Sequence, residues 1–351
     1  MIDWVTARVS LDLFTDEDRE TLRLTSDRIR RFCPLTGETR YETSAWDSIR
    51  SDSHSIVCRV TGSDLWVQGS PARVTGDGDN VFGSGASAAQ DLEGCLDRMV
   101  AFLWGQLPAL TDRPGLRAWK VTRVDVTHNL ALDALSEVRQ FLNYLTRAQA
   151  GRLRVDAKKG DSVYWNANSR YKKAKAYGKG PHLAYLMKRK DFAGRHYTPD
   201  EIALCGLILR LELTLFYRYW EKVLEIPRWW DLTSELLNKE WEAYFKQFIG
   251  TEVRNDEELR KQIDAVAPTA GQAKAAFNMW YMLKSAGYEL TRENHTKTTW
   301  YRNLRVLKAA GLNVTDLGNG TIIPFPTKTL GGAISVSSWS ELRQHVSRLA
   351  A

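Results

Sequence analysis

Long hydrophobic runs are absent from this sequence. No apolar stretch in its 351 residues approaches the roughly 20 residues that span a bilayer. The first residues have neither the basic start nor the apolar run of a signal peptide. We therefore expect no membrane partner and a location in the cytoplasm.

Cysteine is scarce. The four cysteines are scattered and form no Cys-X-X-Cys pair: Cys33, Cys58, Cys95 and Cys205. A zinc ribbon needs such pairs, and a disulfide framework needs a denser pattern. The sequence excludes the ribbon, gives no sign of the framework, and indicates reduced, mostly buried thiols.

Acidic residues are rare in one long basic segment. The whole chain carries a net charge of +7, whereas residues 151–190 contain twelve Lys and Arg against two Asp, a net charge of +10. Basic side chains neutralise phosphates, and aromatic rings stack on unpaired bases. The rings that interleave with the charge are Tyr164, Trp165, Tyr171, Tyr177 and Tyr185. The segment predicts nucleic-acid binding through Arg170, Lys172 and Lys173; a solvated basic face is the alternative.

Strands alternate with helices over about residues 1–230. The alternation and spacing of apolar residues predict strands at 2–13, 55–60, 65–68, 117–130, 162–167, 172–178 and 205–216, and helices at 88–107, 133–149 and 198–204. Gly, Asp and Ser predict a loop over 70–85, and Ser87 is expected to cap the helix after it. The interleaving predicts an α+β domain: an antiparallel-type sheet with helices packed on one face.

Helical periodicity dominates residues 231–351. Candidate helices cover 232–249 and 257–266, and residues 272–312 predict a helix-turn-helix. Its second helix turns Trp300, Leu304 and Leu307 inward. The basic residues left outward are Lys297, Arg302, Arg305 and Lys308. A basic second helix suits the groove of duplex DNA; an ordinary helical hairpin is the alternative.

Two predicted strands share a pattern of alternating basic and acidic residues. Side chains alternate between the two faces of a strand, so Arg123 lies on the same face as Asp125. Arg210 and Glu212 share a face in the same way. If the strands are neighbours, the two carboxylates lie close together and would suit a bridging Mg²⁺ or Mn²⁺. The arginines are candidate DNA contacts; two arginine–carboxylate pairs on a solvated face are the alternative.

The basic segment surrounds a tyrosine with lysines. Lys173, Lys175 and Tyr177 share one face of the predicted strand 172–178. A phenol has a pKa near 10, so a nucleophilic tyrosine needs help to lose its proton, and lysines such as Lys175 and Lys179 favour the phenolate. A tyrosine that is structural or that stacks on a base is the more common case.

Several short motifs occur in an order that resembles a known family. They are Met1-Ile2-Asp3, Ser70-Pro71-Ala72-Arg73, Asn80-Val81-Phe82-Gly83, Arg123-Val124-Asp125, Tyr164-Trp165-Asn166 with Ser169-Arg170, Ala176-Tyr177 and Arg210-Leu211-Glu212. Together they resemble the filamentous-phage (inovirus) replication initiators of the gene II/X type. The resemblance covers most of residues 1–220 and, more weakly, the C-terminal helices.

The resemblance implies a rolling-circle nickase in the bacterial host cytoplasm. Such an enzyme cuts one strand of the replicative-form DNA at the phage origin, becomes joined to the 5′ end through a tyrosine, and later rejoins the strand. The tyrosine corresponds to Tyr177, and the carboxylates that hold the metal correspond to Asp125 and Glu212. Origin DNA, duplex and single-stranded, and a host helicase and polymerase are the implied partners.

Some positions stay open within this interpretation. Tyr171 and Tyr185 are alternative nucleophiles. Asp3 and His182 are candidates to join the site, whereas His128 faces away unless a bulge turns it. The six histidines form no His-hydrophobic-His pair, which favours a site built on carboxylates.

One stretch departs from the family pattern. Gly76-Asp77-Gly78-Asp79 precedes Asn80 where relatives often have a Gly-His pair, so no essential histidine is expected in this loop. Two rival functions fit the same features. A DNA-binding regulator without chemistry would tolerate replacement of Asp125 or Glu212, and a metal-dependent nuclease that uses water would leave no protein–DNA adduct.

Overall fold

The structure of the 351-residue chain is a computed structural model. It describes residues 1–24, 28–44, 47–50, 55–75, 78–83, 91–146, 155–158, 162–188, 192, 194–245, 256–286, 288–312 and 334–350. Parts of the predicted basic segment, including Arg152, Arg154, Arg189 and Lys190, lie outside these residues.

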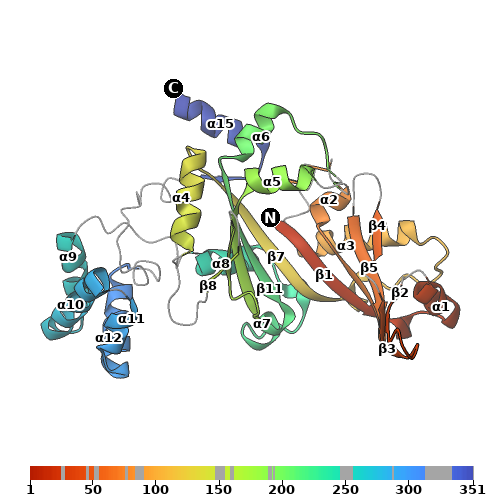
Figure 1. Cartoon of the computed structure of the whole chain (residues 1–351), viewed down its shortest axis with the longest axis horizontal. Coiled ribbons are helices and arrows are strands. Elements are labelled where there is room, and N and C mark those ends of the chain that lie inside the picture. The colour runs from red at the N-terminus through yellow and green to blue at the C-terminus, as the bar shows by residue number, and fades with distance from the viewer. Residues whose placement is uncertain are drawn as a thin grey trace.

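A ten-stranded sheet forms the body of the described structure, in the order β4-β5-β6-β1-β7-β11-β10-β9-β8 with β12 also paired to β7 (Figure 1). Its strands are β1 (Ile2–Ser10), β4 (Asp47–Arg50), β5 (Ser55–Thr61), β6 (Asp64–Gly69), β7 (Lys120–Ala131), β8 (Val155–Lys158), β9 (Ser162–Trp165), β10 (Lys172–Gly178), β11 (Ile208–Phe216) and β12 (Ile334–Val336). Neighbouring strands pair antiparallel throughout. The predicted α+β architecture is confirmed, and β7 and β11 are neighbours.

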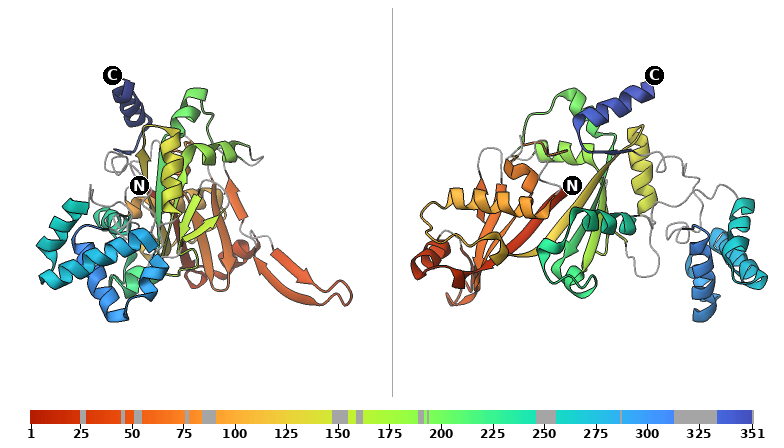
Figure 2. Two further views of the ribbon diagram at one scale, coloured as in Figure 1. Left: turned by 60° about the vertical axis from the view of Figure 1, so that its left-hand side comes forward. Right: turned by 180° about the vertical axis from the view of Figure 1, so that it is seen from behind.

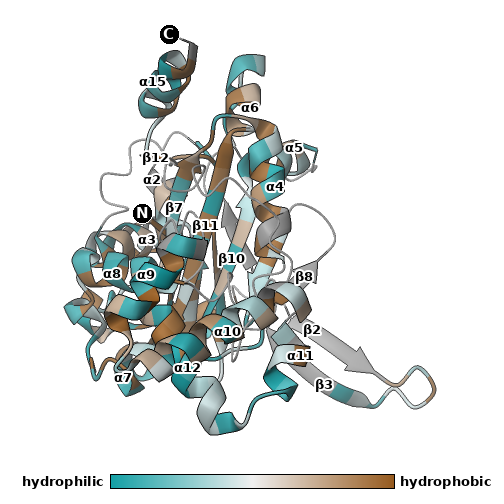
Figure 3. Ribbon diagram, turned by 90° about the vertical axis from the view of Figure 1, so that its left-hand side faces the viewer, coloured by the Kyte–Doolittle hydropathy of each residue, from teal (hydrophilic) through white to brown (hydrophobic). Residues whose placement is uncertain are grey.

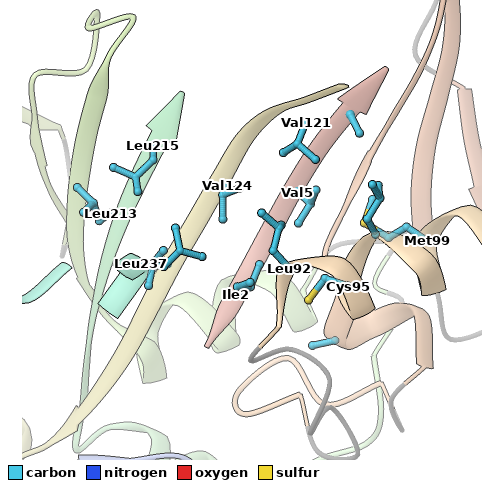
Figure 4. Close-up of a cluster of buried hydrophobic side chains, with 14 of the residues drawn as sticks. Ile2, Val5, Leu92, Cys95, Met99, Val121, Val124, Leu213, Leu215 and Leu237 are labelled. Carbon is cyan, nitrogen blue, oxygen red and sulfur yellow. The ribbon is translucent and has the colours of Figure 1, made fainter. Parts of the chain in front are cut away.

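Helices cover the apolar face of this sheet. Alternation sends Val124 and Val126 of β7 and Leu211 and Leu213 of β11 to the same face, where all are buried. They share one core with three helices: α3 (Leu92–Gln106), α4 (Leu135–Leu145) and α8 (Ser234–Phe245). Figure 4 shows the part of this core that α3 and α8 contribute. With this face filled by helices, the polar side chains of the same strands are left on the other face.

The C-terminal elements return to the sheet. β12 pairs with the end of β7, and α15 (Trp339–Ala350) follows it. They enclose a further core with α5 (Lys179–Met187) and α6 (Pro199–Cys205), in which Leu183, Val336 and Leu342 are buried. Thr198 and Glu201 form a capping box that begins α6. The last described elements are therefore packed with the sheet rather than with the other C-terminal helices.

Four helices form a separate core beside the sheet: α9 (Asp256–Val266), α10 (Ala270–Ala286), α11 (Tyr288–Glu293) and α12 (Lys297–Ala309). Figure 2 shows this group apart from the strands. Thr296 caps α12, and Trp300 and Leu307 are buried as the helical spacing predicts. The predicted turn between α10 and α12 contains the additional short helix α11.

The remaining elements are short. They are α1 (Asp16–Leu24), α2 (Pro71–Thr75), α7 (Tyr217–Lys222), the 3₁₀ turns η1 (Leu11–Leu13), η3 (Leu116–Ala118) and η4 (Trp229–Asp231), and a separate hairpin of β2 (Arg28–Phe32) and β3 (Thr39–Ser44). The hairpin projects from the body (Figure 3). None of the described helices combines the length and apolarity needed to cross a bilayer.

Local differences from the prediction have local causes. The expected loop over 70–85 contains α2, because Pro71 has a fixed backbone angle that suits a first helical turn. Asp91 caps α3 by accepting two backbone bonds, whereas Ser87 lies outside the described residues. The strand expected from residue 205 begins at Ile208, because α6 continues to Cys205.

Candidate active site

The polar face of β10, β11 and β7 carries the candidate site. The register sets Glu212 opposite Lys175 on one side and Thr127 on the other. Tyr177 lies opposite Arg210 one pleat further along. Opposed side chains in an antiparallel pair have Cβ atoms about 4.5–5.5 Å apart, so these groups are brought together by pairing alone.

Tyr177, Glu212 and Lys175 form a connected trio. The Tyr177 hydroxyl donates to Oε1 of Glu212 at 2.5 Å, and Nζ of Lys175 lies 2.6 Å from Oε2. Tyr177 is buried, with 5% of its surface exposed, whereas the Lys175 side chain is 37% exposed. Burial, and then the charge of Glu212, raise the pKa of Tyr177 well above its ordinary value. The phenol is therefore protonated at neutral pH, and the carboxylate that accepts its hydrogen bond is placed to accept its proton.

Asp125 lies on the same face, held by an arginine. Arg123 donates from Nε and Nη2 to the two oxygens of Asp125 at 2.8 and 2.5 Å. Burial, the largest single cause, lowers the pKa of Arg123, but the charge of Asp125, the hydrogen bonds to it and the charges of Glu212 and Asp3 together outweigh burial, so the net shift is upward. A bulge between Ile2 and Trp4 in β1 interrupts the pairing with β7 at Asp3. Asp3 lies 3.6 Å from Arg210, so a third carboxylate borders the site.

Arg210 is buried rather than presented to solvent. It is 2% exposed, its Nε donates to Asn129 Oδ1 at 2.8 Å, and its Nη2 donates to the carbonyl of Val81. The prediction that Arg210 is an outward DNA contact was therefore wrong. Alternation gives the face on which a residue lies, but it does not show which other segments cover that face. The segment 78–83 lies against this end of the sheet and takes up the guanidinium. Arg210 thus orients groups inside the protein.

α5 adds two side chains beside the tyrosine. The His182 ring meets the Tyr177 ring edge-on at 4.8 Å between centroids, and Nζ of Lys179 lies 6.0 Å from the same ring. Lys179 is 1% exposed. His128 lies on the opposite face, stacked on Trp241 at 4.1 Å and bonded to Asn238, so the expectation that it faces away is confirmed.

The other predicted DNA contacts are divided between surfaces. Arg170 is exposed at the start of the β10 hairpin, and Lys173 is half-buried on the face of Lys175. Lys172 points to the helix-covered face, where it contacts Tyr219 and Glu240. On α12, the outward orientation of Lys297, Arg302 and Arg305 is confirmed, because all three are exposed.

The three candidate tyrosines differ in surroundings. Tyr171 and Tyr185 are 44% and 62% exposed. Tyr177 alone among the three has a recorded hydrogen bond from its hydroxyl to a carboxylate. This arrangement favours Tyr177 over the two exposed tyrosines.

The carboxylates fit a hard divalent ion by their chemistry. Asp3, Asp125 and Glu212 supply oxygen ligands of the kind that Mg²⁺ or Mn²⁺ takes. The described residues do not gather three or more acidic, histidine or cysteine ligands into one cluster, and Arg123 and Lys175 occupy the carboxylate oxygens. Both basic side chains are long and partly exposed, at 30% and 37%, so they can withdraw when a cation binds.

Two supporting residues were missed from the sequence. Asn129 receives Arg210, and Asp79 accepts from Tyr197 Oη at 3.0 Å and from Trp339 Nε1 at 2.8 Å. Asn129 follows Asp125 and Thr127 at the same alternation, so extending the pattern by two residues would have found it. The role of Asp79 depends on Trp339, 260 residues away in the chain, and no local signal predicts it.

Comparison with known proteins shows that the chain is similar to replication-associated proteins of phages. The profile of the N-terminal part of the phage replication-associated protein encoded by gene II matches residues 1–233, and the chain belongs to this family, the gene II replication initiators. The replication-associated protein of Enterobacteria phage I2-2 is 27% identical over 92% of each chain. That of Salmonella phage IKe is 25% identical over 72% of this chain and 68% of its own.

A solved structure is similar at a lower level. The rolling circle replication initiator protein from Geobacillus stearothermophilus is 10% identical, with a TM-score of 0.25, over 62% of this chain and 73% of its own. A score of that size does not establish a shared fold.

Proposed function

We propose that this chain initiates rolling-circle replication of a phage genome by nicking one strand of the replicative form at the origin. Tyr177 is the nucleophile, and the product is a 5′-phosphotyrosine link. The observation that carries the proposal is the 2.5 Å hydrogen bond from Tyr177 to Glu212 on the sheet face that also holds Asp125, within a family of replication-associated proteins. The action would take place in the cytoplasm of the bacterial host.

The reaction needs a tyrosine that loses its proton and a phosphate whose negative charge is offset by nearby basic groups. Glu212 accepts the proton of Tyr177 as the phenol oxygen attacks phosphorus and the bond to the 3′ oxygen breaks. Lys175 and Lys179 offset charge that develops on the phosphate. Since Lys175 is the exposed member of the trio, the strand approaches from its side and displaces it from Glu212.

Asp125 and Glu212 would hold Mg²⁺ or Mn²⁺, with Asp3 a third carboxylate at the border. When bound, the ion would make the phosphorus more electrophilic and stabilise the leaving 3′ oxygen. Arg123 would then be released from Asp125 and become available to a DNA phosphate. The phosphotyrosine retains the energy of the broken bond, so a 3′ hydroxyl can later attack it and rejoin the strand.

The proposed partners follow the same division of surfaces. Single-stranded DNA would lie along the polar face, with Arg170 and Lys173 as backbone contacts, and duplex origin DNA would contact α12. A host helicase would unwind the duplex, and a host polymerase would extend the freed 3′ end.

The test is a covalent-adduct assay with the purified protein, Mg²⁺ and origin DNA from its own replicon. A protein-linked strand on a denaturing gel, lost in Tyr177→Phe and after metal chelation, is the expected result. An adduct that persists in Tyr177→Phe would move the nucleophile to Tyr171 or Tyr185. Nicking without an adduct would favour the nuclease that uses water, and binding without any cut would favour the regulator.

A further inference from the structure

A cavity of about 410 Å³ opens beside the candidate site, between the ends of two strands. β1 and β12 pair with the same edge of β7, since β11 occupies the other edge. The pairing with β1 ends at Val126, and that with β12 begins at Asn129. The cavity lies at this break, and residues from both faces of the sheet line it, Thr127 from the polar face and His128 from the helix-covered face.

The lining has the character of a site for a neutral, flat, polar-edged ligand. Phe82, Leu237 and Val336 supply apolar walls, and Ser234, Asn238 and Ser337 supply neutral hydrogen-bonding groups. Among the described residues, no Lys, Arg, Asp or Glu side chain lines it; the N-terminal ammonium of Met1 does line it and donates to the carbonyl of Thr127 at 3.2 Å. A heteroaromatic ring with donors and acceptors along one edge matches the neutral side chains of such a lining.

One lining group has an unmet hydrogen-bonding capacity. The hydroxyl of Thr127 is buried, with the residue 1% exposed, and has no hydrogen-bond partner within the described structure. A buried hydroxyl without a partner costs free energy, and a ligand recovers it by moving the side chains that leave this oxygen less than 1 Å² of accessible surface. Thr127 also lies directly opposite Glu212 in the register, so a ligand that meets this hydroxyl lies beside the group that accepts from Tyr177.

We propose that this cavity binds one unpaired nucleobase of the substrate strand, next to the phosphate that is cut. The proposal rests on the proposed function for the identity of the strand. It gives the protein a means of recognising a base at the nick by extruding it from the strand into a shaped pocket. Thr127 and the side-chain amide nitrogen of Asn238 would bond the edge of the base, and Phe82 would pack against its ring.

The test measures binding alone, by fluorescence anisotropy of single-stranded oligonucleotides that span the nick, each with one abasic position. In the wild type, one abasic position beside the nick should weaken binding about tenfold, the typical effect of losing one base contact. Ser234→Phe places a ring in the cavity and should bind the intact oligonucleotide about tenfold more weakly. In this variant, removing the base at the sensitive position should weaken binding no further. Ala243→Phe adds the same ring to an exposed position of α8 outside the cavity and should behave as wild type.

A second variant covers the case in which Ser234→Phe does not fold. Thr127→Val removes only the hydroxyl and should reduce the discrimination at the sensitive position several-fold. The proposal is overturned if no abasic position weakens wild-type binding, or if both variants discriminate as the wild type does. Because no cleavage is needed, discrimination without an adduct would retain the pocket and reject the nickase. An adduct formed by a protein that does not discriminate the abasic position would retain the nickase and reject the pocket.

Discussion

At the scale of single residues, Glu212 is the group on which the proposed chemistry depends. Glu212→Gln keeps the shape but removes the charge that accepts from Tyr177 and pairs with Lys175. We expect adduct formation to slow by about 10²–10⁴-fold, the usual contribution of a positioned proton acceptor. Single-turnover rates of adduct formation at saturating origin DNA would measure it.

The chain supplies a matched control for this variant. Tyr219 donates to Glu240 at 2.5 Å, and Lys172 lies 3.9 Å from the same carboxylate, so the trio recurs on the helix-covered face. Glu240→Gln should leave the rate of adduct formation within about twofold of wild type. It should lower the free energy of unfolding by about as much as Glu212→Gln does. Equal loss of activity in both variants would mean that Glu212 acts only through folding. Because the trio recurs, it does not define a site by itself, and the proposal for Tyr177 also depends on the neighbouring carboxylates Asp125 and Asp3.

Arg210 is predicted to matter for stability. Arg210→Met leaves Asn129 and the carbonyl of Val81 without their donor and leaves Asp3 beside an apolar side chain. Removing one member of a buried charged network typically costs about 3–5 kcal/mol. Denaturant unfolding would measure it, with the exposed Arg170→Met as a control expected within about 0.5 kcal/mol of wild type. An unfolding free energy unchanged in Arg210→Met would contradict the structural role.

The alternation of residues predicted most of this face. It gave the face of Asp125, Glu212 and Tyr177 within each strand, because the period of two needs no knowledge of the rest of the fold, whereas the pairing of β7 with β11 was only assumed and Tyr177 was chosen through the family resemblance. The pairing of Arg123 with Asp125 was one of the alternatives that alternation left open, whereas the burial of Arg210 was not predicted. That burial depends on the segment 78–83, whose position local sequence does not encode.

At the scale of elements, α15 is predicted to hold the segment 78–83. Trp339 bonds Asp79 at 2.8 Å and packs edge-on against Phe82 at 5.2 Å. Trp339→Ala should cost about 1–3 kcal/mol, less than for a fully buried tryptophan because its side chain is only partly covered. It should also raise amide hydrogen exchange over 78–83. The exposed Ser340→Ala on the same helix is the control, and unchanged exchange in the tryptophan variant would refute the link.

The ion pair that joins α6 to its neighbours gives a pH dependence. Hydrogen bonds from Arg195 lower the pKa of Glu201 from 4.5 to about 2. A pKa lowered by folding means stability that is present above pH 4.5 and is lost as the pH falls toward 2. We therefore expect Glu201→Gln to have a lower Tm at pH 7 and a shallower decline in Tm over that range. Parallel acid profiles of the two proteins would contradict this assignment.

Short elements that depend on distant partners were not predicted from the sequence. β12 spans three residues and is a strand only because the edge of β7 is free beyond β1. α5 carries little that separates it from a loop, and the core that it shares with α15 is assembled from residues between Val81 and Leu342. By contrast, α3, α4 and α12 have long apolar faces and were predicted.

At the scale of the whole molecule, the proposed strand cleavage and the proposed duplex binding belong to two parts of the protein with separate cores. The sheet and the helices α9–α12 have separate hydrophobic cores. The candidate site belongs to the first core, and the exposed basic face of α12 belongs to the second. A division of this kind predicts that each activity can be weakened without the other.

The double variant Arg302→Gln with Arg305→Gln tests that division. Both side chains are exposed on α12, whose buried residues include Trp300 and Leu307, so the helix should stay folded. If both contact phosphates, duplex affinity should fall, and the slope of log Kd against log salt should decrease by about 2, close to 1 for each lost contact. The rate of adduct formation on a short single-stranded oligonucleotide should stay the same. An unchanged salt slope would remove α12 from the DNA interface, and a loss of single-strand cleavage would show that the two bodies act on one strand as a unit.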